Sequence, residues 1–400
     1  MSRRWLATVS GPLAQYAPGF AEDLVILGYS KSAAKKQMQL LAHLDHWLEA
    51  EGRGVGELTT DLVEPLFAAR RREGRSNLLT TKSLKPLLGF LRRAGIPEPP
   101  MAAPTDPVEL MVDRYRRHLV RERGLVEGTV HFYTYVARLF LLERSVIEGA
   151  GLADLEALDV IEFTGRVCEG RGLSSARQAV SALRSFLRWL QMEGLTRRVL
   201  DQAVLSVAGW SPNLPRAVET GQVASLLRSC DRRRALGRRD YAILVLLVRL
   251  GLRGGEVVGL ELGDVDWRLG EILVRGKGRR EDRLPLPSDV GEALAGYIKR
   301  GRPHSASRRV FLRHHAPFVG LADTGAIRGV LARACDRAAI AYVSPHRLRH
   351  TAASEMLRAG APLSEIAQVL RHRSPATTSS YAKVDQSRLG QLARQWPGAA

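Results

Sequence analysis

The first half of this 400-residue chain contains the same small helical pattern twice, at about 27–96 and about 122–195. Each copy runs from a glycine into a long amphipathic stretch and then an acid-capped helix. A Gly-Arg-Ser or Gly-Leu-Ser turn and a last Leu-rich helix follow. Because four features recur in the same order, the sequence predicts duplication of one all-helical unit. Chance similarity between amphipathic helices is the alternative.

Two proline-containing breaks divide the chain into three parts. The segment EPPMAAPTDP at 98–107 has the composition of a linker, and SPNLPRAVET at 211–220 separates the helical half from the rest. The sequence therefore predicts a helical domain at 1–100, a second helical domain at 101–210 and a third domain at 211–400. The predicted fold is mainly α, with a small β-hairpin or sheet in the third domain.

The basic charge of the chain lies mostly in its second half. Residues 1–210 carry 28 Lys and Arg against 24 Asp and Glu, a net charge of +4, whereas residues 211–400 carry 32 against 17, a net charge of +15. A field of this sign attracts polyanions such as nucleic acids, although ribosomal and membrane-surface proteins share it. The longest apolar run, residues 242–248, is far shorter than the roughly 20 residues of a membrane span.

The N-terminus and the cysteines favour a cytoplasmic protein without disulfides. Ser, Gly, Pro and Gln interrupt the apolar stretch that a secretory signal would need near the start of the chain. Cys168, Cys230 and Cys335 are scattered and form no CxxC or Cys/His ligand spacing, so the sequence predicts neither a disulfide framework nor a structural zinc. No Asp/Glu cluster has metal-ligand spacing, and we expect no metal and no cofactor.

An arginine at the start of a short helix is the first candidate site residue. In RLGLRGGEVVGLEL, Arg253 lies near the predicted helix start, and Glu256 follows three residues later on the same face. An arginine offers a fixed fork to two phosphate oxygens, and a nearby carboxylate orients it. A surface Arg–Glu pair is the alternative interpretation.

A lysine in the turn of a predicted β-hairpin is the second candidate. EILVRGKGRREDRLPLP has the pattern of a hairpin whose turn contains Lys277 between two glycines. The chain holds only 8 Lys against 52 Arg, so the choice of lysine at this position is informative. A lysine can release a proton where an arginine does not, which suits a general acid. A solvated lysine without a role is the alternative.

The most specific pattern is SPHRLRHTAASEML. Ser344 predicts a helix cap and Pro345 the first helical position, which puts His346 and Arg349 on one face of the first turns. The exposed backbone N–H groups and the helix dipole at that end favour a phosphate. A core position for His346 is the alternative.

The segment APLSEIAQVLRHRSPATTSSYAKV carries the last candidates. A short helix from Pro362 is followed by His372 in a loop, and a second capped start at Ser374 begins a helix with Thr378 and Tyr381 three residues apart. A tyrosine at helical spacing is more often part of a core than of a site. Tyr381 therefore gains its meaning from the other candidates.

Together these motifs resemble the catalytic domain of the tyrosine recombinase (phage integrase) family over about 215–385. The resemblance rests on the Arg box, the hairpin lysine, the His-x-x-Arg box and the His-to-Tyr stretch, in family order. The helical half is similar to the SAM-like core-binding domain of that family, present twice, as in integrases of transposable elements such as the recombinase-in-trio type. Leu250 stands where Thr is common and Arg371 where Gly is frequent, departures expected to affect only local loop geometry.

The resemblance implies site-specific cutting and rejoining of DNA through a 3′-phosphotyrosyl intermediate, without metal or ATP. The residues to which it assigns catalytic roles are Arg253, Lys277, His346, Arg349, His372 and Tyr381, with Glu256 and Thr378 in support. The two arginines and His372 would contact the non-bridging phosphate oxygens. The lysine would protonate the leaving 5′ oxygen, and His346 would accept the tyrosine proton.

The implied partner is double-stranded DNA, bound by a homo-tetramer on two DNA sites or by an assembly with sister recombinases. The extra N-terminal unit would extend the DNA footprint or contact a neighbouring protomer. Three alternatives differ in function. A type IB topoisomerase would use nearly the same residues, and a catalytically idle DNA-binding protein would serve as a partner of another recombinase. A basic regulator would use LSEIAQVL as the first helix of a helix-turn-helix.

Overall fold

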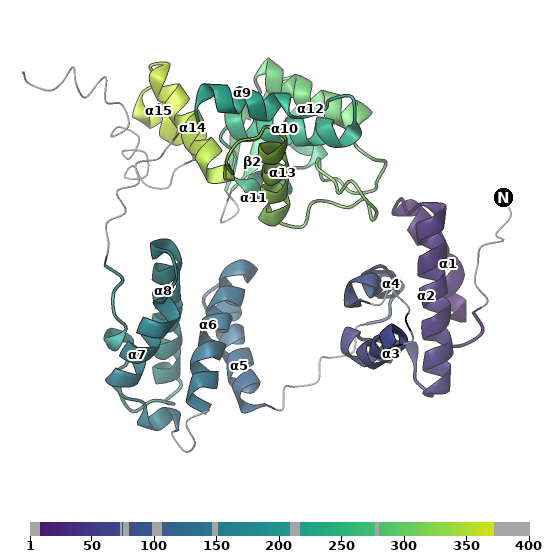
Figure 1. The fold of residues 1–400 in the computed structure, drawn as a ribbon, viewed down its shortest axis with the longest axis vertical. Helices are drawn as coiled ribbons and strands as arrows, with labels where there is room; N and C mark the ends of the chain where they lie inside the picture. Colours follow the sequence, from purple (N-terminus) through teal and green to yellow (C-terminus); the bar gives the residue numbers. More distant parts are fainter. Residues whose placement is uncertain are drawn as a thin grey trace, which may run out of the picture. The chain divides into compact units, whose positions relative to one another are not determined.

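The computed structural model describes residues 9–72, 74, 80–97, 106–145, 151–208, 217–276 and 280–371. The chain divides into two compact units, one formed by residues 1–99 together with 213–400 and the other by residues 100–212 (Figure 1). Each of the three successive parts of the chain has a hydrophobic cluster of its own.

The first part is built from four helices around a leucine-rich core. They are α1 (Ala17–Ile26), α2 (Lys31–Ala50), α3 (Thr60–Arg72) and α4 (Thr81–Arg93). Ser30 caps α2 by accepting a hydrogen bond from Ala33 N at 3.3 Å. The buried Asp45 carboxylate of α2 accepts hydrogen bonds from the backbone N–H groups of Ser10, Gly11 and Leu13, which fastens the segment before α1.

The second part repeats this order of elements. Its helices are α5 (Pro107–Arg121), α6 (Glu127–Ser145), α7 (Ala157–Cys168) and α8 (Leu173–Met192). In both parts a 3-10 turn, Val55–Glu57 or Leu152–Asp154, separates the second helix from the third. The core here is aromatic, and the hydroxyl of the buried Tyr115 donates a hydrogen bond to Ser185 Oγ at 2.9 Å. The repeated order is what the predicted duplication requires.

The third part surrounds a helix that is buried on all sides. Residues 242–248 of α10 are all at most 5% exposed, because α10 packs against α9 and the four helices α11 to α14. The helices of this part are α9 (Thr220–Arg228), α10 (Ala235–Arg249), α11 (Gly254–Gly259), α12 (Ser288–Arg300), α13 (Thr324–Arg337), α14 (Pro345–Arg358) and α15 (Leu363–Leu370).

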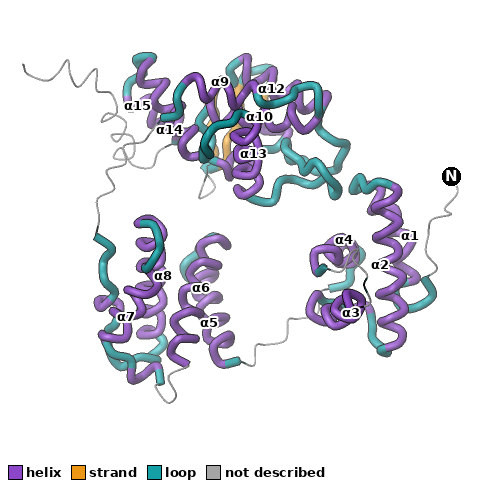
Figure 2. The backbone as a smooth tube through the Cα atoms, viewed as in Figure 1, coloured by secondary structure: helices purple, strands orange, loops and turns teal. Residues whose placement is uncertain are grey.

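A small antiparallel sheet lies among these helices (Figure 2). Its strands are β1 (Val265–Asp266), β2 (Glu271–Arg275) and β3 (Glu281–Pro285) in the order β1-β2-β3. The buried Ile272 and Val274 point into the core, and Leu273 pairs with Arg283. Gly276 N donates to Arg280 O at 2.8 Å across the turn. The predicted fold class, mainly helical with a small β-hairpin, is confirmed.

Among the described residues, no helix combines the length and the apolar character that crossing a membrane requires. The three cysteines are free, and Cys230 and Cys335 are buried while Cys168 is partly buried.

Candidate active site

Arg253 stands at the N-terminus of α11, where its carboxylate partner holds it. Arg253 Nη1 donates to Glu256 Oε1 at 2.8 Å, and Arg253 N donates to Glu256 Oε2 at 2.7 Å. The guanidinium itself reaches solvent, because 42% of the Arg253 side chain is exposed whereas only 3% of the Glu256 side chain is. The predicted spacing of this pair on one helix face is confirmed. A charged, exposed and oriented guanidinium suits the binding of an anion.

The Glu256 carboxylate is the buried centre of this arrangement. Besides its two hydrogen bonds from Arg253, it accepts one at 2.7 Å from Nη2 of Arg371, the residue that ends α15. Burial raises the pKa of Glu256, but the positive charge of Arg371 and the hydrogen bonds from Arg253 hold the pKa below its usual value overall. Glu256 is therefore ionised at neutral pH.

Arg349 lies one turn into α14 and is 2% exposed. Its Nη1 donates to the carbonyl oxygen of Gly251 at 2.6 Å, and its Nη2 donates to the carbonyl oxygen of Leu370. Gly251 has a φ of +56°, and a Cβ atom there would lie 2.6 Å from Leu370 Cδ2. Both the left-handed backbone and the closeness of Leu370 favour glycine at this position. The carbonyls of two distant segments thus aim the second arginine.

His346 lies at the start of α14, in the electrostatic field of both arginines. Ser344 Oγ accepts from Arg347 N at 3.2 Å and Pro345 occupies the first turn, so the predicted cap is confirmed. Burial lowers the pKa of His346, and the charges of Arg349 and Arg253 lower it further. His346 is therefore neutral at pH 7 and able to accept a proton.

A second histidine lies against this one. The rings of His346 and His350 meet edge to face with their centroids 4.3 Å apart. Burial lowers the pKa of His350 to about 4, and His346 and Arg349 contribute to the shift. Because His350 stays neutral, it adds no positive charge beside His346 near neutral pH.

The β2-β3 hairpin begins its turn beside the carboxylate centre. A Cβ atom on Gly276 would lie 3.9 Å from Glu256 Oε1, so the turn leaves the sheet next to the Arg253–Glu256 pair. The candidate that follows, Lys277, lies outside the described residues. His372, Thr378 and Tyr381 also lie outside them, directly after Arg371 in the chain.

The expectation that Arg371 affects only loop geometry is wrong. Its side chain is 5% exposed and forms an ion pair with the 3% exposed Glu256 at 2.7 Å. The only sequence signal was the departure from glycine before His372. Gly251 was missed as well, although it stands two residues before Arg253. By contrast, Leu250 is a buried residue of the hydrophobic core.

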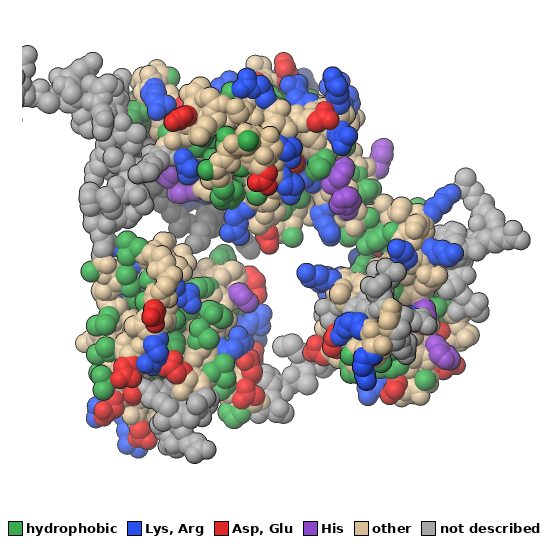
Figure 3. Space-filling model, viewed as in Figure 1, with side chains coloured by type: hydrophobic (Ala, Val, Ile, Leu, Met, Phe, Trp, Pro, Cys, Tyr) green, Lys and Arg blue, Asp and Glu red, His purple; other side chains and the backbone are tan. Residues whose placement is uncertain are grey.

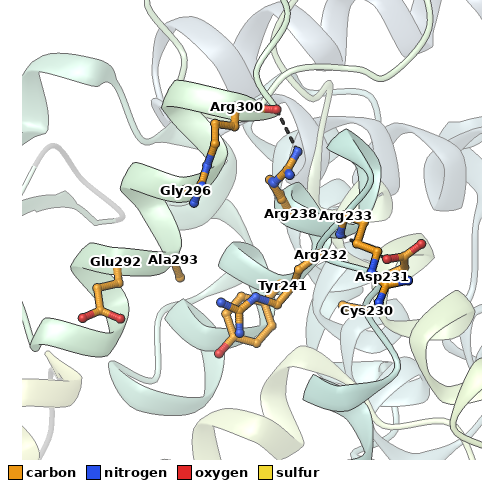
Figure 4. Close-up of a pocket in the computed structure, with 10 residues that line it drawn as sticks. All are labelled: Cys230, Asp231, Arg232, Arg233, Arg238, Tyr241, Glu292, Ala293, Gly296 and Arg300. Carbon is orange, nitrogen blue, oxygen red and sulfur yellow. Dashed lines mark hydrogen bonds between the residues drawn. The ribbon is translucent and has the colours of Figure 1, made fainter.

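A separate basic recess lies away from these residues. Its volume is about 410 Å³, and it lies between the segment 230–241 and α12. In Figure 4, the Arg238 guanidinium donates to the Arg300 carbonyl oxygen at 2.9 Å, and the Arg232 side chain lies over the Tyr241 ring. No predicted site residue lines it. Lys and Arg side chains are also spread over the face of the 217–371 part seen in Figure 3.

Two family models match the chain. Residues 216–388 match the phage integrase family, and residues 112–194 match the phage integrase N-terminal SAM-like domain. The second match covers the repeat formed by α5 to α8, and the first covers the part that contains both arginines.

Relatives agree with these matches, one of them along nearly the whole chain. "Putative integrase/recombinase y4rA" of Sinorhizobium fredii is 41% identical over 395 residues, which cover 98% of this chain and 96% of that protein. Tyrosine recombinase XerD of Mycobacterium tuberculosis is 32% identical over 311 residues, which cover 72% of this chain and 97% of that protein.

Solved structures show the same fold at lower sequence identity. The XerH site-specific recombinase bound to its palindromic difH substrate has a TM-score of 0.57 at 17% identity, with 74% of this chain and 99% of that chain covered. The Tn1549 transposon integrase in complex with circular intermediate DNA has a TM-score of 0.52 at 17% identity, with 71% and 99% covered. The chain belongs to the phage integrase family, the tyrosine recombinases, and is a site-specific recombinase.

Proposed function

We propose that Arg253 and Arg349 bind the non-bridging oxygens of a DNA phosphodiester during strand cleavage. The observation that carries this proposal is that both arginines are fixed by adjacent segments: Arg253 bonds to Glu256 and to the Arg371 carbonyl, and Arg349 bonds to the carbonyls of Gly251 and Leu370. Arg253, Arg349 and Arg371 carry three positive charges against the one negative charge of Glu256. The net positive charge stabilises the negative charge that develops around the pentacoordinate phosphorus. His372 would complete this set.

Tyr381 would be the nucleophile and His346 its proton acceptor. A tyrosine hydroxyl has an ordinary pKa near ~10 and is a poor nucleophile unaided, so a neutral acceptor raises its reactivity. The lowered pKa of His346 supports this role because it keeps the ring unprotonated at neutral pH. The Tyr381 oxygen forms a bond to phosphorus while the bond to the 5′ oxygen breaks, which leaves a 3′-phosphotyrosyl linkage.

Lys277 would protonate the leaving 5′ oxygen. The position of Gly276 beside Glu256 supports this role, because the residue just before the lysine lies next to the Arg253–Glu256 ion pair. One phosphoester bond replaces another, so the phosphotyrosyl linkage keeps the energy of the broken bond. Attack by a free 5′-hydroxyl of a second duplex then reverses the step and joins new strands without ATP. Glu256 would orient Arg253, and Thr378 would support the helix that carries the tyrosine.

The substrate in this proposal is double-stranded DNA, bound in the cytoplasm. The net charge of +15 in residues 211–400 supports an electrostatic contribution to that binding. Strand exchange would take place in a homo-tetramer on two DNA sites, or in an assembly with sister recombinases of the same mobile element. Integration or transposition of that element would be the outcome.

The helices α1 to α4 form the part of the chain whose role is least defined. We propose the domain boundaries 1–100, 101–210 and 211–400, with the first domain extending the DNA footprint or contacting a neighbouring protomer. Its shared element order with α5 to α8 supports this role. A chain that begins at residue 106 is expected to protect a shorter DNA segment or to assemble less well. An unchanged footprint and an unchanged assembly state would contradict the role.

Covalent trapping tests the proposed chemistry. The full-length protein is incubated in EDTA with nicked suicide duplexes that carry the end sequences of its element, then denatured and separated by size. We expect a metal-independent protein–DNA adduct that Tyr381→Phe abolishes while DNA binding persists. If the parent protein binds the duplex but forms no adduct, the chain would instead act as a DNA-binding partner of another recombinase.

A further inference from the structure

Arg371 occupies a backbone conformation that an arginine does not favour. It ends α15 with a φ of 54° and a ψ of 50°, in the left-handed region. An L-residue other than glycine loses roughly 1–2 kcal/mol there relative to the right-handed region. Since glycine would adopt this conformation without strain, the local backbone gives no reason for a long cationic side chain. The reason has to lie in what the side chain contacts.

Those contacts tie the side chain and the main chain of Arg371 to the first catalytic arginine. Arg371 Nη2 donates to Glu256 Oε2 at 2.7 Å, and its Nη1 donates to Val369 O at 2.7 Å. Its carbonyl oxygen accepts a hydrogen bond from Arg253 Nη2 at 3.1 Å. Arg371 therefore reaches Arg253 by two routes, one through Glu256 and one through its own carbonyl.

Burial separates the tasks of the two arginines. The Arg371 side chain is 5% exposed and the Arg253 side chain 42% exposed, although both bond to the same carboxylate. Arg371 Nη2 bonds to Glu256 Oε2, and the Arg253 side chain bonds to the other carboxylate oxygen, Oε1. Arg253 Nη1 and Nη2 are therefore held by Glu256 and by the Arg371 carbonyl, while 42% of the side chain stays exposed to solvent.

We propose that Arg371 is a positioning residue, which acts through Glu256 and through its own carbonyl to orient the Arg253 guanidinium for the scissile phosphate. This inference rests on the proposed role of Arg253. It also links that arginine to the segment carrying His372, because Arg371 is the preceding residue. A fixed guanidinium stabilises the transition state without reorganising during the reaction.

The test compares single-turnover cleavage of the nicked suicide duplex by full-length variants. Arg371→Gly removes the guanidinium but accepts the left-handed backbone, so the loop keeps its conformation. We expect cleavage to slow about tenfold to hundredfold, because a misplaced catalytic group costs up to this much. The dissociation constant for the duplex should change less than about threefold. Arg371→Lys, which keeps the charge, should recover part of the rate.

A matched control separates the side chain from the backbone. Ala339 is the other non-glycine residue with a positive φ among the described residues, at 51°, and it is exposed. Ala339→Gly relieves the same kind of backbone strain and should leave cleavage at the parental rate. Equal slowing by Ala339→Gly and Arg371→Gly would overturn the inference, since a general loosening of the fold would explain both.

A double-mutant cycle decides whether Arg371 acts through Arg253. If it does, Arg371→Gly costs little further rate in a chain that already carries Arg253→Ala. Full additivity of the two losses, or a parental rate for Arg371→Gly beside a strongly impaired Arg253→Ala, overturns this inference alone. A parental rate for Arg253→Ala overturns the proposed role of Arg253 and this inference together.

Discussion

Two buried carboxylates in the third part of the chain, Glu256 and Asp240, each lie near two arginines. They differ in whether a hydrogen-bonded arginine is exposed to solvent. At Glu256, the hydrogen-bonded arginines are the buried Arg371 and the partly exposed Arg253. At Asp240, which is 1% exposed, the hydrogen-bonded arginine is Arg239, which is 6% exposed. Of these two clusters, the Glu256 cluster is the one whose hydrogen-bonded arginine is partly exposed to solvent.

The hydrogen-bonded arginine of the Asp240 cluster makes a further contact inside the protein. Arg239 Nη1 donates to Leu312 O at 3.1 Å, which connects α10 to the segment after α12. The exposed Arg333 comes only within 3.8 Å of Asp240 Oδ2 and forms an ion pair with it. The hydrogen bonds of the Asp240 cluster stay in the core, whereas the Glu256 cluster holds the partly exposed Arg253. This difference supports the proposal that Arg253 binds phosphate, and it leads us to expect that the Asp240 cluster stabilises the fold.

The largest expected effect is a loss of stability at the Asp240 cluster. Asp240→Ala leaves the buried Arg239 guanidinium without its carboxylate, which costs about 3–5 kcal/mol of unfolding free energy. Thermal unfolding of the full-length chain measures it as a lower Tm of the third part. The double variant Arg239→Met with Asp240→Leu should recover much of the loss, because it removes both charges. A Tm unchanged by Asp240→Ala would contradict the assigned role.

At the Glu256 cluster, removing an arginine should lower activity and leave stability nearly unchanged. Arg253→Ala is expected to slow covalent adduct formation by about 10²–10³-fold, as the loss of a charge-stabilising donor does. Its Tm should stay close to the parental value, since Glu256 keeps its ion pair with the buried Arg371. Adduct formation on the suicide duplex and thermal unfolding are measured on the same preparation. A large fall in Tm would show that the Glu256 cluster also carries the fold.

His346 and His350, beside the Glu256 cluster, should make stability depend on pH. The pKa of His350 is lowered to about 4 in the folded chain, against an ordinary value of about 6.5. The unfolded chain therefore binds a proton that the folded chain refuses, and the unfolding free energy falls as the pH drops from about 6.5 toward 4. Denaturant unfolding at a series of pH values measures this slope.

A substitution separates that histidine from the others. His350→Gln should flatten the pH dependence between pH 6.5 and 5, a range in which Glu256 is still ionised because its pKa lies below its usual value. The histidine ring signals in an NMR titration should show one midpoint near 4. An ordinary midpoint for His350 would refute the assignment.

The smallest expected effect concerns a pair of the same chemistry on the surface. Arg249 Nε donates to Asp289 Oδ2 at 2.5 Å, and the two side chains are 55% and 42% exposed. Solvent screens such a pair, so Arg249→Ala should change the unfolding free energy by about 0.2–1 kcal/mol. Thermal unfolding beside Asp240→Ala tests it. A loss of unfolding free energy as large as that of Asp240→Ala would show that burial does not determine how much each ion pair contributes to stability.

Much of the fold was predictable because its signals are local. The cap at Ser344 and Pro345, the β2-β3 hairpin and the three-residue spacing of Arg253 and Glu256 each depend on neighbours within a few residues. The repeated order of helices was visible in the sequence for the same reason, since amphipathic spacing and turn residues recur in both copies.

The sequence by itself determined which residue types are present for phosphate chemistry and which short elements carry them. Only the tertiary structure decided that Arg371 shares the carboxylate of Glu256, 115 residues away, and that Gly251 and Leu370 offer their carbonyls to Arg349. Hydrophobic periodicity specifies which face of a helix is buried but not which distant polar group will meet it. That choice is made when α14 packs against α15 and when Arg253, at the start of α11, meets Arg371 at the end of α15.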